Sequence, residues 1–163
     1  MTEFARIYLP IDGLGIIFYS PWAVQHIPSG TDYLGASFLE PEDIARHVNA
    51  SSLTGFGTGG SGNYDLIVSL DAPDAEGLQR AQFKVELGLE VRDETVCFRD
   101  LYELIHWEPE CPPGQSLHIP DGFYRVLAYT TFGPVGKTQP IYLSFLRVPA
   151  RPELHFTGAP ELC

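Results

Sequence analysis

The chain has 163 residues, of which 44% are hydrophobic and 12% aromatic, so length and composition predict one domain with a substantial core. Its formal net charge is −11, from 21 acidic and 10 basic residues, which argues against nucleic-acid and anionic-lipid partners and favours a basic protein. No apolar run approaches the length of about 18 residues that a membrane span needs, and the first residues lack a signal-peptide pattern. We therefore expect a cytoplasmic protein.

The cysteines also indicate a cytoplasmic protein. Cys97, Cys111 and Cys163 are an odd number, so no pairing satisfies all three, and we expect reduced thiols. Cys97 lies in a strand pattern, where it is expected to act as a small core residue.

The first third of the chain predicts two strands, a loop and a helix. The strands are expected over residues 4–9 and 14–19, and the Pro- and Gly-rich residues 20–39 read as a loop. Residues 41–50 predict a short helix, because Pro41 suits its first turn and acids follow at once.

A glycine cluster over residues 55–62 resembles the loops that bind phosphate groups. A phosphate loop needs a strand before it, a helix after it and usually a lysine. Here no lysine is near, and the alternating residues 64–70 predict a strand after the cluster. We interpret the glycines as a flexible or bulged entry into that strand.

Residues 81–91 give the clearest strand pattern, with apolar and polar residues in strict alternation. One face should therefore lie in the core and the other in solvent. We expect a hairpin from this strand into residues 95–98. A short helix is expected next, because Asp100 and Glu103 have the spacing of a capping box.

Residues 117–132 form the unit around which the chain is organised. The order Pro120, Gly122, Tyr124 predicts a tight turn followed by a tyrosine corner, in which the tyrosine hydroxyl bonds to backbone upstream. Apolar residues on both faces of the following strand suggest a central position. A last strand is expected over residues 141–148.

Together these elements predict a mainly β protein, an antiparallel β-sandwich with two short helices. A single sandwich domain is expected to span residues 1–163, with residues 149–163, which hold three prolines, as a loosely ordered tail.

Catalytic and metal-binding patterns are weak. The five histidines do not have zinc-ligand spacing with one another or with cysteine, and the one Gly-Ser-Gly stretch does not fit a nucleophile elbow. The alternative hypothesis is a ligand- or calcium-binding sandwich module, since aspartates are expected at strand ends: Asp71, Asp74, Asp93 and Asp121. An enzyme that uses Cys97 or a histidine is the third. We predict no catalytic residue, metal or cofactor.

The second half of the chain resembles the competence protein J family, which includes an inhibitor of a DNA-entry nuclease. The resemblance covers residues 54–148 and depends on the strand patterns at 83–91 and 95–98, and on residues 116–126 with their Pro-x-Gly-x-Tyr element. It implies a β-sandwich that binds and silences a nuclease. It implies no catalytic residue, and Pro120, Gly122 and Tyr124 would be structural.

The leading hypothesis is thus an immunity or inhibitor protein that binds a cognate nuclease or toxin one to one through an acidic surface. Residues 71–110 alone hold eleven acids and four bases. A basic DNA groove would attract such a surface over long range. The predicted partner-binding residues lie on the polar face of the long strand and its flanks: Asp71, Asp74, Glu76, Glu86, Glu90, Asp93 and Glu94. The oligomeric state does not follow from the sequence.

Overall fold

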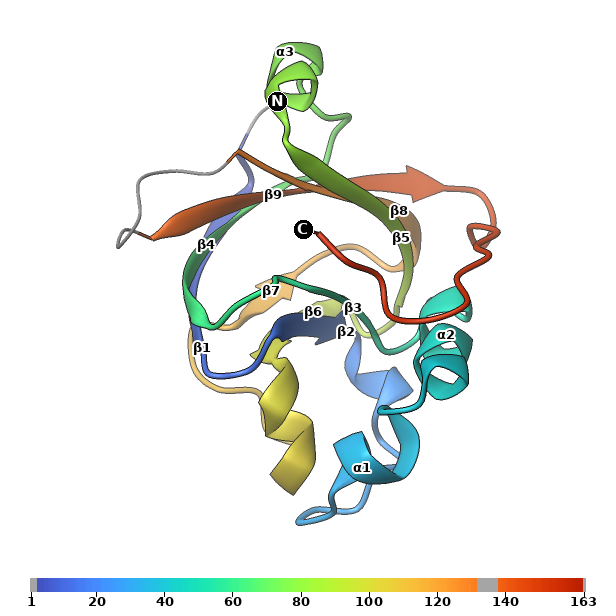
Figure 1. Ribbon diagram of the computed structural model, residues 1–163. Helices are drawn as coiled ribbons and strands as arrows, with labels where there is room; N and C mark the ends of the chain where they lie inside the picture. The colour runs from blue at the N-terminus through green and yellow to red at the C-terminus, as the bar shows by residue number, and fades with distance from the viewer. Residues whose placement is uncertain (1–2, 132–137, 163) are drawn as a thin grey trace.

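The computed structural model describes residues 3–131 and 138–162, and it is a β-sandwich of two packed sheets with most of the helices on one side (Figure 1). The five-stranded sheet has the order β1-β4-β9-β8-β5, and the four-stranded sheet has the order β3-β2-β6-β7. The strands of the larger sheet are β1 (Ala5–Ile11), β4 (Gly62–Ser69), β5 (Phe83–Val91), β8 (Gly122–Thr130) and β9 (Gln139–Val148). Those of the smaller sheet are β2 (Gly15–Tyr19), β3 (Thr54–Gly57), β6 (Thr95–Asp100) and β7 (Ser116–His118).

The predicted fold class is confirmed, with one difference in strand direction. All paired strands run antiparallel except β4 and β9, which are parallel with Leu66 opposite Ile141. The five-stranded sheet is therefore mixed.

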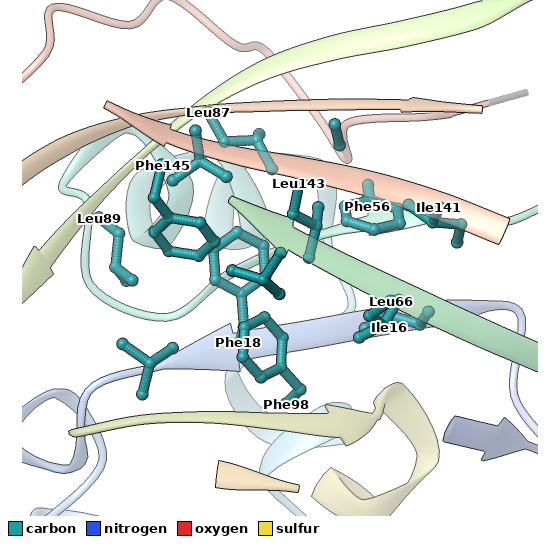
Figure 2. Packing of buried hydrophobic residues seen from close by; sticks show 14 of the residues in the cluster. Ile16, Phe18, Phe56, Leu66, Leu87, Leu89, Phe98, Ile141, Leu143 and Phe145 are labelled. Carbon is teal, nitrogen blue, oxygen red and sulfur yellow. The ribbon is translucent and has the colours of Figure 1, made fainter. Parts of the chain in front are cut away.

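Phenylalanines fill the space between the two sheets. Phe18 stacks on Phe98 with ring centroids 5.6 Å apart, and Phe145 from the opposite sheet lies 6.0 Å from Phe18 (Figure 2). All three are fully buried, together with aliphatic residues from both sheets. Burying such rings stabilises a core by about 1.5–3 kcal/mol per side chain.

A second cluster of buried residues covers the outer face of the four-stranded sheet. It includes Ile17 and Tyr19 of β2 and Trp107, so β2 is buried on both faces, as its unbroken apolar sequence predicts. The cover comes from four short helices and the loops beside them: η1 (Pro21–Ala23), α1 (Tyr33–Ser37), α2 (Pro41–Asn49) and η2 (Leu101–His106). A further helix, α3 (Ala75–Arg80), lies away from this face at one end of the larger sheet (Figure 1). The predicted helices correspond to α2 and to η2, which begins with the expected capping box. The short α1 and α3 were not predicted.

The prediction of a hairpin between residues 81–91 and residues 95–98 is wrong. β5 pairs with β8 in one sheet, whereas β6 pairs with β2 and β7 in the other. Asp93 and Glu94 both have positive φ angles, 57° and 53°, and turn the chain from one sheet to the other. The hydroxyl of Ser20 holds this crossing, because it donates to the Arg92 carbonyl at 2.7 Å and accepts from the Arg92 amide at 3.0 Å.

Two further expectations differ from the structure. Cys97 and Cys111 form a disulfide, so the prediction of reduced thiols is wrong for this pair. The loop that contains Cys111 folds back onto β6, where the amide of Phe98 donates a hydrogen bond to the Gln115 carbonyl. Cys163 and Phe132 lie outside the described residues.

Residues 149–162 are held in place, in contrast to the loose tail that we expected. Asn49 exchanges two hydrogen bonds with the backbone of Phe156, at 2.9 and 3.0 Å. Gly57 accepts from Leu162 and donates to Pro160, so the segment runs parallel to β3 and buries the Leu162 side chain. Figure 1 shows this segment, in red, passing beside α2.

Candidate functional site

The seven predicted partner-binding acids lie before, on and after β5. Asp71, Asp74 and Glu76 precede β5, whereas Asp93 and Glu94 follow it. Since β5 has nine residues at about 3.3 Å each, the two groups lie roughly 30 Å apart. Glu86 and Glu90 lie between them on β5.

The group before β5 is engaged in local structure. Asp74 is the N-cap of α3 and accepts from the Gly77 amide at 3.2 Å. Glu76 pairs with Arg80 one turn along the same helix. Asp71 accepts a hydrogen bond from the Ser69 hydroxyl at the end of β4.

Glu86, Glu90 and Glu94, on and after β5, contact basic side chains. Glu86 pairs with Arg125 of the neighbouring β8 at 2.8 Å. Glu90 is only 12% exposed and contacts Arg92 at 2.6 Å and Arg151 at 3.7 Å. Glu94 lies 2.6 Å from the imidazole of His118. Glu86 and Glu90 are therefore balanced by arginines, which weakens their contribution to the long-range field.

The three residues predicted to be structural form the turn into β8. The Tyr124 hydroxyl donates to the Pro120 carbonyl at 2.6 Å, which is the hydrogen bond of a tyrosine corner. Burial raises the pKa of Tyr124 and keeps the hydroxyl protonated as a donor. Gly122 has φ 145°, and a Cβ there would lie 2.7 Å from Nε of Arg147, so only glycine fits.

A second acidic region, which sequence reasoning did not select, surrounds the turn between β1 and β2. The Asp100 carboxylate accepts from the amides of Asp12 at 2.8 Å and Gly13 at 3.1 Å, and from the Tyr102 amide at 3.1 Å. The capping-box pattern in the sequence marked Asp100 as a residue with a structural role. It did not reveal that the Asp100 carboxylate contacts a turn 87 residues away.

Exposed apolar residues accompany these carboxylates. Leu14 in the turn is 56% exposed, and Tyr102 and Ile105 of η2 are 43% and 45% exposed. Residues three apart in a 3₁₀ helix project in the same direction, so Tyr102 and Ile105 share one face. Gly13 packs against the Tyr102 ring, which places the turn beside η2.

An apolar cleft of about 90 Å³ opens next to this turn. Residues of β2 and β3 line it: Gly15, Ile16, Ile17, Gly55, Phe56 and Gly57. The rest of the apolar lining comes from the end of α1, from α2, from η2 and from the C-terminal segment: Phe38, Ile44, Val48, Leu101, Ala159 and Pro160. Glu161 is the one ionisable residue of the lining, and its carboxylate lies where a side chain at Gly57 would be.

Arg99 is a buried cation behind the same helical layer. Its guanidinium donates to the Glu108 carbonyl at 2.7 Å, the Tyr19 hydroxyl at 3.2 Å and the Glu103 carboxylate at 3.1 Å, and it stacks on Trp107 at 4.4 Å. Burial disfavours the charge, but these partners outweigh it and raise the pKa of Arg99. Burial also raises the pKa of Tyr19.

Tyr33 and His47 join α1 to α2. The Tyr33 hydroxyl lies 2.6 Å from Nε2 of His47, and Nδ1 of His47 lies 2.6 Å from the Asp43 carbonyl. Nδ1 must donate to that carbonyl, so in the neutral ring Nε2 accepts from the tyrosine hydroxyl. Burial lowers the pKa of His47 accordingly.

Other chemistry has little support within the part of the chain that is described. No three histidine, cysteine or acidic side chains there gather as metal ligands. Cys97 is bonded to Cys111 and so does not offer a free thiol. None of the described helices has both the length and the apolar character of a membrane-crossing segment.

No family model and no curated protein matches the sequence. Two solved structures share the fold. ComJ from Bacillus subtilis, described as an inhibitor of the DNA degrading activity of NucA, superimposes with a TM-score of 0.59 at 11% identity, over 90% of this chain and 98% of that one. The product of crocagin biosynthetic gene J gives a TM-score of 0.54 at 19% identity, over 88% and 98% of the two chains. The fold is thus ComJ-like.

Proposed function

We propose that this protein is an inhibitor, of the immunity type, that binds and neutralises a cognate nuclease through an acidic surface. The observation that carries the proposal is the fold shared with ComJ over nearly the whole length of both chains. The protein would act by covering a surface of the nuclease and not by a reaction of its own. A cytoplasmic location stays a prediction, and the Cys97–Cys111 disulfide removes the support that reduced thiols would give it.

The charge of the chain supports a nuclease as partner. Nucleases bind a polyanion and therefore present basic grooves, and a protein of net charge −11 is attracted to such a groove over long range. At low salt this attraction raises the association rate, and added salt screens it. The role of the seven acids near β5 in that contact stays a prediction.

The test is capture followed by an activity assay. The chain, tagged at its N-terminus, is incubated with lysate of its own cells at low salt, and bound proteins are eluted at high salt. We expect the eluate to degrade plasmid DNA, and we expect one equivalent of the added chain to stop the degradation.

An unrelated protein of equal size and net charge is the matched control, because nonspecific attraction would also capture basic proteins. The proposal fails if the eluate has no nuclease activity, or if both proteins suppress that activity equally.

A further inference from the structure

We infer that the cleft beside Glu161 is the point at which a basic protein partner docks, and that an arginine side chain of the partner enters it. The identity of the partner as a nuclease rests on the function proposed above. The surface is defined by the cleft lining together with Asp12, Leu14, Tyr102 and Ile105, and we refer to it as the cleft surface.

The lining of the cleft suits an arginine side chain. Its walls are apolar and include Phe38, Ile44 and Leu101, against which the three methylene groups of arginine can pack. Glu161 supplies a carboxylate at the cleft, and a guanidinium can bind a carboxylate with two parallel hydrogen bonds.

The charges around the cleft favour a cation. No arginine, lysine or histidine lines it. The ion pairs found within residues 3–131 and 138–162 do not involve Glu161, Asp12 or Asp100. These carboxylates are therefore unbalanced, in contrast to Glu86 and Glu90 of β5, which already contact arginines.

The rim supplies the contact area that a protein partner needs. Leu101 of the cleft precedes Tyr102, and Gly15 of the cleft follows Leu14, so exposed apolar residues directly adjoin the cleft lining in the chain. A side chain at Gly15 would lie 3.4 Å from Leu101, which confirms that the turn and η2 meet here. Tyrosines with a surrounding polar rim are frequent among the residues that dominate binding energy.

The first test uses a defined probe. N-acetyl-arginine amide is titrated into the isotopically labelled full chain, and amide shifts are followed by NMR. We expect saturable shifts at Gly15, Gly57 and Leu101, and binding of the uncharged citrulline analogue that is roughly tenfold weaker. Glu161→Gln should remove the difference between the two probes, whereas Glu86→Gln should keep it.

Each outcome of the titration is decisive. Saturable shifts at the cleft that depend on Glu161 support the inference. Absence of shifts there, shifts confined to the β5 surface, or equal binding of the two probes to the wild-type chain would overturn it. The spectra themselves show whether each variant is folded.

The second test uses the nuclease recovered by capture. Tyr102→Ala and Glu161→Gln should each raise the concentration needed for half inhibition about tenfold or more, while Glu86→Gln should change it less than about threefold. If the wild-type chain inhibits the nuclease and all three variants inhibit it equally well, the cleft surface is not the docking site, and the proposed function stands. If the wild-type chain inhibits no nuclease, the proposed function fails, and the titration still decides whether the cleft takes arginine.

Discussion

The two outer faces of the sandwich carry their acidic residues in different ways. On the five-stranded sheet and its flanks, Glu86 and Glu90 contact arginines from neighbouring segments. On the four-stranded side, Asp12, Asp100 and Glu161 lie beside exposed apolar residues and a cleft. Net charge in the sequence therefore does not locate an acidic surface, because pairing in the fold decides which carboxylates remain unbalanced.

The largest expected difference in stability is between removal of a buried arginine and removal of an exposed one. Arg99→Ala should lower the free energy of unfolding by about 3–5 kcal/mol, because it removes a cation on which Tyr19, Glu103 and the Glu108 carbonyl depend. Arg125→Ala removes only an exposed pair with Glu86 and should cost less than about 1 kcal/mol. Urea unfolding measures both, and equal losses would contradict the contrast between the two sides.

The second largest expected loss of stability tests whether the C-terminal segment, residues 149–162, is part of the folded core. Leu162→Ala should cost about 2–3 kcal/mol, because the side chain is buried in the main core. Leu146→Ala, on the exposed face of β9, is the matched control and should cost well under 1 kcal/mol. A small loss at Leu162 in thermal or urea unfolding would mean that the segment is not part of the cooperative structure.

A third, smaller effect concerns the tyrosine corner of the five-stranded sheet. Tyr124→Phe removes the hydrogen bond to the Pro120 carbonyl and should cost about 1 kcal/mol with no change in core packing. Tyr8→Phe is the control, since Tyr8 is 54% exposed. Denaturation midpoints that do not separate the two variants would argue against a structural role for the corner.

The smallest expected effect is a pH dependence of stability that arises from His47 of α2. The pKa of His47 is lowered by burial, so below pH about 6.5 the unfolded chain binds a proton that the folded chain does not. Stability should be constant above that pH and fall as the pH drops below it. Unfolding curves at pH about 7.5 and pH about 5.5 should show this loss reduced in His47→Gln and unchanged in His155→Gln. His155 is 80% exposed, and a loss that persists in His47→Gln would assign the effect elsewhere.

The sequence predicted the parts of the fold that local patterns determine. The alternation over residues 81–91, the capping box at Asp100 and the Pro120–Tyr124 turn all depend on neighbours in the chain. The structure contains a strand over Phe83–Val91, the capping box and the turn. The course of the chain after β5 was predicted wrongly, because a short polar turn is equally compatible with a hairpin and with a crossing to the opposite sheet.

The candidate site was less predictable than the fold. Glu161 reaches the cleft only because residues 160–162 pair with Gly57, about a hundred residues earlier in the chain. Likewise, the approach of Cys111 to Cys97 depends on how the loop before β7 folds back. Such long-range contacts leave no periodic signal, so composition led to the acids near β5 instead.

The pairing of residues 160–162 with β3 also has a consequence for self-association. A sheet that ends in unpaired backbone groups can add a strand from another molecule and so begin aggregation or domain exchange. Here the chain satisfies the Gly57 groups with its own backbone. A shortened chain that lacks these residues should therefore dimerise or aggregate through β3. A tag for purification is better placed at the other terminus, where it leaves this intramolecular cap undisturbed.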